Sequence, residues 1–205
     1  MRILVLAPHT DDAEISCGGT ISRMIRESND VYVTAFSASK KSLLEGFDDD
    51  VTRREFHESM KYIGIENYTL FDYPTRHFPE HRQEILDDII HIGNMFCPDI
   101  VFLHNSYDIH QDHQVIYQEG IRVFRNRTIY GYENPWNNMG KSNISTYIRL
   151  NIDDVKNKMN MMKIYKSQMY KKRDMEDSVM NLLKMRGTEV DVEYAEAFET
   201  IRSVI

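Results

Sequence analysis

Short apolar runs alternate along the chain with longer amphipathic or polar stretches. The apolar runs have the length of buried strands and are rich in β-branched and aromatic residues. They predict strands at residues 3–6, 31–36, 68–71, 99–104, 128–133 and 145–150. Apolar positions at helical spacing predict helices at residues 14–27, 51–63, 82–96, 113–124 and 155–169. This alternation predicts an α/β fold, with a mostly parallel sheet between helices on both faces.

Residues 37–50 are polar and predict a loop, while Gly64 is a typical end signal for the helix before it. The rhythm changes after residue 138, and the portion from about residue 145 onward favours helix apart from one last strand. No repeat, low-complexity tract or linker divides the chain. We therefore predict a single domain over residues 1–205, with a helix-leaning C-terminal portion.

The composition is that of an ordinary globular protein, with 205 residues, 41% hydrophobic and 28% charged. A formal net charge of −7 disfavours attraction to nucleic acid or an anionic membrane. Two cysteines, Cys17 and Cys97, form no disulfide framework and fit a reducing compartment. There is no secretory signal pattern and no run long enough to insert into a membrane, so we expect a soluble cytoplasmic protein.

Two clusters of chemically active residues follow two of the predicted strands. His9, Asp11 and Asp12 come directly after the first strand. Residues 108–113, with the sequence Asp-Ile-His-Gln-Asp-His, follow the strand at 99–104. Ligands of α/β sheets bind at the carboxyl ends of the strands, so we expect the two clusters to be halves of one site.

The residue types favour a metal ion at this site. His9 and Asp12 are three apart, which places them on the same side of a helical turn, and His113 would be the third ligand. Histidine and carboxylate ligands suit zinc, and three protein ligands plus a water are the catalytic pattern. A zinc-bound water has a pKa of roughly 7. A lone His-x-x-Asp is common and such Asp residues often only cap a helix, but the second cluster is harder to dismiss.

The remaining residues of the clusters supply acid–base candidates. The side chain of Asp11 points in a different direction from that of its neighbour Asp12, so Asp11 can face the metal-bound water as general base. His110, as an imidazolium, would stabilise the oxyanion or protonate the leaving amine. Asp112 or Asp108 would be the carboxylate that orients it.

These motifs resemble the LmbE-like family of zinc-dependent deacetylases, also called the PIG-L family. The first signature of the family is matched by residues 8–14, Pro-His-Thr-Asp-Asp-Ala-Glu, followed by Cys-Gly-Gly-Thr at 17–20. The second is matched by His-Gln-Asp-His at 110–113, after the Pro-Asp strand at 98–102. Further likeness lies at residues 132–136, 167–168, 186–187 and 194–199. Thr10 replaces a frequent Pro and Ala13 separates the Asp pair from Glu14, which leaves the ligands and the base in place.

The resemblance implies a Rossmann-like three-layer fold and one Zn²⁺ per chain, held by His9, Asp12 and His113. It also implies Asp11 as base and His110 as acid or oxyanion partner. The implied activity is hydrolysis of an N-acetyl group from an amino sugar or sugar conjugate, nucleotide-linked ones included, giving acetate and a free amine. The expected partners are this small-molecule substrate and further copies of the chain in a homo-oligomer.

Five residues are candidates for contacting substrate. The resemblance implies one arginine before the helix that corresponds to residues 55–63, and either Arg53 or Arg54 fits. Arg76 follows the third strand and could bind a hydroxyl or a phosphate, although an exposed Arg is often only solvated. Trp136 could stack on a sugar ring or fill the core. Asp108 is the fifth candidate.

Two other functions remain open. Two histidines and one carboxylate also describe non-haem Fe(II) oxygenases, although a strand-dominated sequence would be expected there. A non-catalytic carbohydrate-binding protein is the other alternative. Asp11 and His110 speak against it, because a protein that only binds sugar needs neither a base nor an acid.

Overall fold

The computed structural model describes residues 1–38, 46–138, 143–169 and 174–204, so part of the predicted 37–50 loop lies outside the described residues. The strands are β1 (Arg2–His9), β2 (Asp30–Ser37), β3 (Tyr68–Leu70), β4 (Ile100–His104), β5 (Thr128–Tyr132), β6 (Ile144–Leu150) and β7 (Tyr194–Arg202). The helices are α1 (Asp12–Arg26), α2 (Val51–Ile63), α3 (Arg82–Phe96), α4 (Gln111–Val123), α5 (Ile152–Ile164), α6 (Lys166–Met169) and α7 (Met175–Thr188), with a 3₁₀ turn at Phe78–His81.

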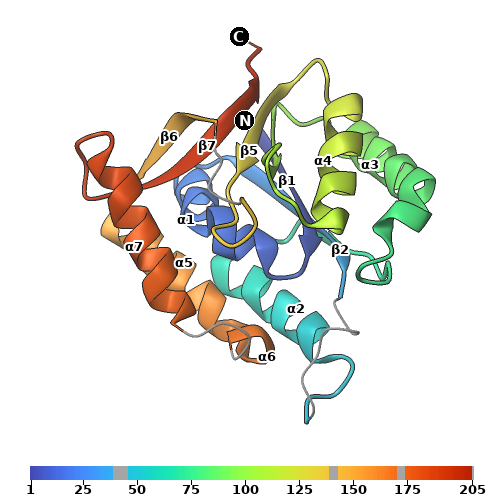
Figure 1. Ribbon diagram of the computed structural model, residues 1–205, viewed down its shortest axis with the longest axis horizontal. Helices are drawn as coiled ribbons and strands as arrows, with labels where there is room; N and C mark the ends of the chain where they lie inside the picture. The colour runs from blue at the N-terminus through green and yellow to red at the C-terminus, as the bar shows by residue number, and fades with distance from the viewer. Residues whose placement is uncertain (39–45, 139–142, 170–173, 205) are drawn as a thin grey trace.

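The seven strands of the described residues lie in one sheet, in the order β3-β2-β1-β4-β5-β7-β6 (Figure 1). The pairs from β3 to β5 are parallel, whereas β7 runs antiparallel to both β5 and β6. The predicted α/β fold with a mostly parallel sheet is therefore confirmed. β4 is the central strand and β1 lies beside it, between β2 and β4, so the carboxyl ends of β1 and β4 are adjacent near the middle of the sheet edge.

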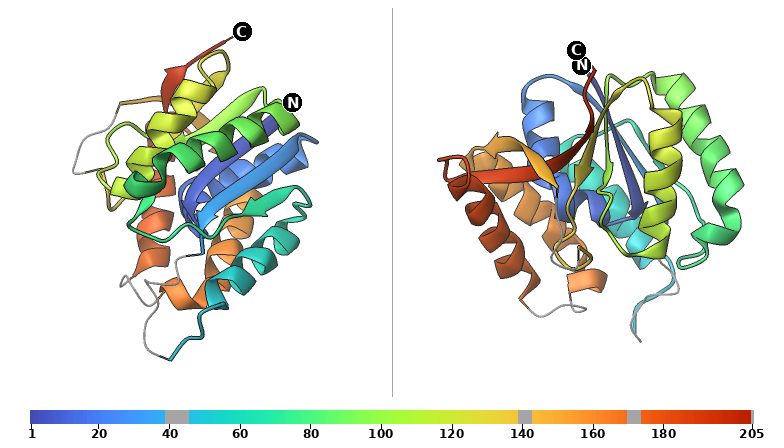
Figure 2. Two further views of the ribbon diagram at one scale, coloured as in Figure 1. Left: turned by 90° about the vertical axis from the view of Figure 1, so that its right-hand side faces the viewer. Right: turned by 45° about the horizontal axis from the view of Figure 1, so that its top comes forward.

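Helices cover both faces of the sheet, as Figure 2 shows. Alternate residues of β1 enter two different cores: Val5 packs in the cluster that contains Phe56 of α2, and Leu6 in the one that contains Ile89 of α3. This alternation is the period of a strand that is buried on both faces. A third apolar cluster joins α5 and α7, through residues such as Val155 and Leu183.

The C-terminal portion is mixed, with helices α5, α6 and α7 and strands β6 and β7. The helix predicted at 155–169 is interrupted at Tyr165, between α5 and α6, and residues 194–202 form strand β7. Ala and Glu dominate the first half of β7 and favour helix, but their burial between β5 and β6 outweighs that local preference. Among the described residues, no helix combines the length and apolarity needed to cross a lipid bilayer.

Candidate metal centre

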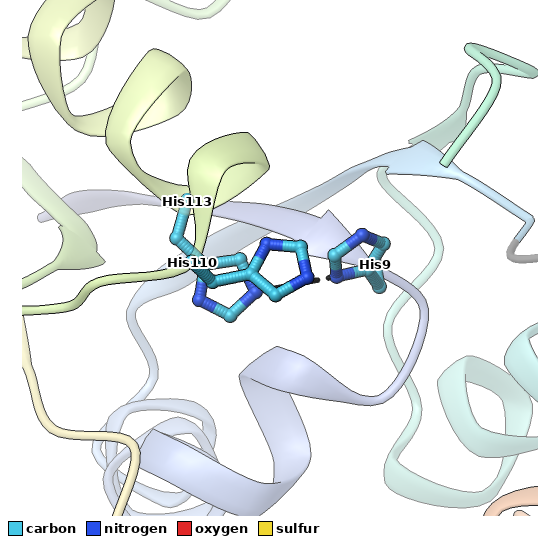
Figure 3. A group of neighbouring side chains, drawn as sticks. All are labelled: His9, His110 and His113. Atoms are coloured by element: carbon cyan, nitrogen blue, oxygen red, sulfur yellow. Dashed lines mark hydrogen bonds between the residues drawn. The ribbon is translucent and has the colours of Figure 1, made fainter. Parts of the chain in front are cut away.

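The two clusters meet at the carboxyl ends of β1 and β4, which are neighbours in the sheet. β1 ends at His9 and α1 begins at Asp12, while α4 carries His113 in its first turn. In Figure 3 the rings of His110 and His113 reach from the start of α4 toward His9 at the end of β1. Residues about a hundred positions apart in the chain thus share one small, mostly buried space.

Three side-chain atoms from His9, Asp12 and His113 face one another. His9 Nδ1 lies 3.1 Å from Asp12 Oδ2, and His113 Nε2 lies 3.3 Å from His9 Nδ1 and 3.4 Å from Asp12 Oδ2. All three residues are buried. Nitrogen and oxygen ligands of a tetrahedral zinc ion are about 3.3 Å apart, given metal–ligand distances near 2.0–2.1 Å. The spacing of these atoms therefore suits an ion of that size.

Each histidine ring of this triad binds a buried carboxylate on its opposite side. His9 Nε2 lies 3.0 Å from Asp112 Oδ2, and His113 Nδ1 lies 2.8 Å from Asp108 Oδ2. Such carboxylates fix the tautomer of a metal-binding histidine, so that its other nitrogen presents the lone pair. The backbone amide of Arg76 in turn donates to Asp112 Oδ2 at 2.7 Å and holds that carboxylate in place.

The charges around the triad favour a cation. Burial opposes charge on His9, but hydrogen bonds to Asp112 and Asp12 outweigh it and raise its pKa to about 10. Burial also opposes charge on Asp12, yet interactions with His113 and the other histidines hold its pKa well below the usual range. Burial and the nearby His104 charge lower the pKa of His113 to about 4. The Asp12 carboxylate therefore stays ionised and His113 stays neutral, whereas a cation bound here must displace a proton from the His9 ring.

His110 has a different environment from the one expected. Its ring Nδ1 accepts the backbone N–H of Asp112 at 3.2 Å, which makes His110 the N-cap of α4. The carboxylates of Asp108 and Asp112 contact His113 and His9, so the prediction that one of them orients the His110 ring is wrong. Because Nδ1 accepts a hydrogen bond, the proton of the neutral ring lies on Nε2. Burial, and then the charge of His9, lower the His110 pKa.

His104, the last residue of β4, is a buried member of the second cluster to which the sequence analysis assigned no role. Its ring stacks on His113 at a centroid distance of 3.7 Å. Its Nδ1 lies 3.1 Å from Asp108 Oδ2, and its Nε2 lies 3.6 Å from Asp12 Oδ2. His104 forms a potential ligand set with Asp12 and His113, and His110 forms another with His9 and His113. The position of His104 at a strand end, four residues before Asp108, was the available signal.

Asp11 and Asp108 lie at different depths in the site. Asp11 immediately precedes α1, is half-buried, and makes no side-chain capping hydrogen bond to that helix. Asp11 is therefore the N-cap residue of α1 by position, and its carboxylate is not used to cap the helix. Asp108 is only 2% exposed and its carboxylate binds His113 and His104, which places it behind these two rings, whereas a substrate contact was expected.

The other substrate candidates lie around the two clusters. Arg53 is half-buried and lies 3.5 Å from Asp72, while Arg54 is exposed and pairs with Asp48 at 2.6 Å. Arg76 has an exposed side chain and a left-handed backbone with φ of 70°, and its amide binds Asp112. Trp136 is half-buried and packs against the α5–α7 cluster.

The fold and the site together define a class of protein: α/β proteins with a buried histidine–carboxylate cluster at the carboxyl ends of their strands. Within that class, residues 4–124 match the model of the PIG-L family, described as GlcNAc-PI de-N-acetylase, and the chain belongs to this family. The family resemblance drawn from the motifs is thereby confirmed. A curated relative is the uncharacterized deacetylase YaiS of Escherichia coli K12, which is 28% identical over 142 residues, 65% of this chain and 74% of that protein.

Solved structures share the fold at low sequence identity. The N,N'-diacetylchitobiose deacetylase of Pyrococcus horikoshii superposes with a TM-score of 0.82 at 20% identity, over 98% of this chain and 83% of that one. The conserved protein TT1542 of Thermus thermophilus gives 0.80 at 19%, over 99% and 95%. The 4-carboxy-2-hydroxymuconate hydratase GalB of Pseudomonas putida gives 0.81 at 16%, over 100% and 97%. Deacetylases and a hydratase thus share this architecture, so the reaction must be argued from the site.

Proposed function

We propose that this protein is a zinc-dependent hydrolase that removes the N-acetyl group of an amino sugar or sugar conjugate. The observation that carries the proposal is the triad of His9, Asp12 and His113, whose facing atoms lie within 3.4 Å of one another. A buried carboxylate behind each histidine supports it. Membership of a de-N-acetylase family supports the reaction class.

His9, Asp12 and His113 would hold the zinc ion, one per chain. When bound there, zinc would polarise an amide carbonyl and lower the pKa of a water to roughly 7. Asp11 adjoins the ligand Asp12, and adjacent side chains diverge, so Asp11 is the residue that takes the proton of the attacking water as general base. Asp11 can then pass that proton to the amine that leaves.

His110 stabilises the negative charge that develops on the carbonyl oxygen. Its Nδ1 is occupied by the amide of Asp112, so Nε2 carries the only proton of the neutral ring. A donor fixed in this way needs no reorganisation during the reaction, which is the condition for effective oxyanion stabilisation. The lowered pKa of His110 favours this role over the imidazolium that the sequence analysis assumed. Asp112 contributes by orienting His9.

Acetylated amino sugars are the substrate class we propose, nucleotide-linked sugars included. The family description names an N-acetylglucosamine conjugate, and the similar Pyrococcus horikoshii enzyme is a diacetylchitobiose deacetylase. Of the two arginines of α2, Arg53 is the better candidate, because it reaches Asp72 just beyond β3, at the carboxyl edge of the sheet. The exposed Arg76 and the half-buried Trp136 are further candidates. Self-association and a cytoplasmic location stay predictions.

The first test is acetate release from a panel of N-acetylated sugars, free and nucleotide-linked, by the zinc-loaded protein and by Asp11→Asn in parallel. Removing a general base lowers kcat by about 10²- to 10⁴-fold, and we expect zinc binding to be unchanged. Near-native turnover by Asp11→Asn would contradict the assigned base. Saturable sugar binding without acetate from the native protein would instead favour a binding function.

A further inference from the structure

Helix α1, which begins at the proposed ligand Asp12, is interrupted in its middle. Cys17 has φ of −134° and ψ of 23°, outside the helical region. The five residues Asp12–Ser16 before the break are thus separated from the longer helical piece that follows. A break of this kind leaves carbonyls before it and amides after it without their helical partners.

A buried ion pair occupies the break. The ammonium of Lys158 donates to the carbonyl oxygen of Ile15 at 2.6 Å, and the carboxylate of Glu196 accepts the amide of Gly19 at 3.0 Å and the amide of Thr20 at 2.6 Å. In an uninterrupted helix, Ile15 and Gly19 would bond to each other. The two side chains also bond each other, with Lys158 Nζ 2.6 Å from Glu196 Oε1. They stand between the two halves of the helix.

The chain is built to admit this pair. Lys158 is 1% exposed and Glu196 is 4% exposed, so both charges are compensated almost entirely by each other and by α1. A Cβ atom on Gly19 would lie 2.4 Å from Leu150 Cδ1 and 3.2 Å from Glu196 Oε1, so a side chain at position 19 would force Leu150 to shift and would crowd Glu196. Lys158 belongs to α5 and Glu196 to β7, both outside residues 4–124.

We propose that Lys158 and Glu196 are positioning residues that set the direction of the first part of α1, and with it Asp11 and Asp12. This inference rests on the proposed function of the metal site. A helical segment of five residues does not hold its own conformation in isolation, so its direction depends on outside contacts. Tyr165 supplies another such contact, because its hydroxyl lies 2.6 Å from the carbonyl oxygen of Thr10. The ion pair fixes the far end of the same segment.

Asp154 offers a matched control on the same two helices. It is 1% exposed, and from α5 it binds Arg26 at 2.9 Å and Ser22 at 3.2 Å, both on the far side of the break. Replacing it removes a buried charge contact between α5 and α1 without touching the segment that carries Asp12. A merely structural role of Lys158 and Glu196 would make their variants behave like Asp154→Asn.

The test compares Glu196→Gln, the double variant Lys158→Met with Glu196→Gln, and Asp154→Asn. The double variant leaves no unpaired buried charge, and Glu196→Gln alone keeps an acceptor oxygen at the break. If one of these two proteins does not fold, the other still tests the inference. Zinc affinity is measured by competition with a chelator. Co²⁺ binding is followed by its visible absorption, which reports the geometry of the ligands.

We expect both variants of the ion pair to bind Zn²⁺ about tenfold more weakly, which is the lower end of the affinity loss caused by removing outer-sphere partners of a metal site. We also expect the visible absorption bands of bound Co²⁺ to shift. Asp154→Asn should lose thermal stability but keep the native affinity and spectrum. Native affinity and spectrum in the ion-pair variants would overturn the inference. Failure of the native protein to bind either metal, or undiminished binding by His9→Ala, would instead overturn the proposed function and the inference with it.

Discussion

At the scale of single residues, the site depends on carboxylates that contact a histidine and are not themselves proposed metal ligands. Asp112 shows this best, because one of its oxygens binds both His9 and the amide of Arg76. The other oxygen accepts the amide of Phe78 at 3.3 Å. The carboxylate thus links the loop before α3 to the orientation of the His9 ring. A change at Asp112 should therefore act on metal binding through His9.

Asp112→Asn should weaken zinc binding by about 10- to 100-fold, the usual effect of losing an outer carboxylate. The amide can still accept a hydrogen bond but no longer stabilises the ring that donates to it. Competition with a chelator measures the change. Asp87→Asn, an exposed position on α3, is the control and should bind zinc as the native protein does. Equal affinities in the two variants would show that Asp112 does not tune His9.

The two cysteines should differ in reactivity. Cys17 is fully buried, and burial, with the charge of Glu196 added, raises the pKa of its thiol well above the usual range. Cys97 is partly exposed. Since the thiolate is the nucleophile, native protein should lose one thiol rapidly to an alkylating reagent and the second only in denaturant. Rapid loss of both thiols from folded protein would mean that the break in α1 opens readily. Cys97→Ser separates the two signals.

At the scale of elements, the sequence predicted what local pattern determines. The helices at 51–63 and 82–96 match α2 and α3 residue for residue, since a clear apolar face and an end signal such as Gly64 mark them. β7 was missed because its Ala and Glu residues become strand-like only between two partner strands. The break in α1 was missed for the same reason, since Lys158 and Glu196 lie far along the chain.

The ligand candidates could be predicted because their spacing follows a strand end and a helical turn. The partners of the rings could not, because Asp108 and Asp112 flank His110 at similar distances in sequence. The backbone at the start of α4 determines the direction of each carboxylate. Asp108 contacts His113 and Asp112 contacts His9. His104 was undervalued because a histidine at the end of an apolar strand shows nothing of the neighbours it meets across the sheet edge.

Gly19→Ala tests the packing at the break in α1. Its new methyl group would meet Leu150, and overpacking of this kind costs about 1–3 kcal/mol of unfolding free energy. Leu150→Ala removes the obstructing side chain, so the double variant should be less destabilised than the two single changes added together. Urea denaturation of the four proteins measures this coupling. Strict additivity would show that Leu150 is not what excludes a side chain at position 19.

At the scale of the whole molecule, the family model matches a shorter part of the chain than the part that folds into one sheet around the site. Residues 4–124 contain both clusters. Yet β7 lies between β5 and β6 and supplies two buried glutamates that contact the segments next to the clusters. Glu196 enters the break in α1, and Glu199 accepts the amide and the hydroxyl of Ser106, each at 2.8 Å, in the loop that leads to Asp108. The C-terminal portion is therefore part of what holds the site together.

A fragment of residues 1–132 should fail to form this site even though it contains His9, Asp12 and His113. Without β7, strand β5 becomes an open edge and Ser106 loses its carboxylate partner. Without α5, the apolar face of α1 is left in water. We expect a broad, non-cooperative urea transition and zinc binding far weaker than that of the whole chain, measured by circular dichroism and chelator competition. A cooperative transition with native zinc affinity would mean that the first five strands carry the site alone, and the contacts of Glu196 and Glu199 would then be dispensable.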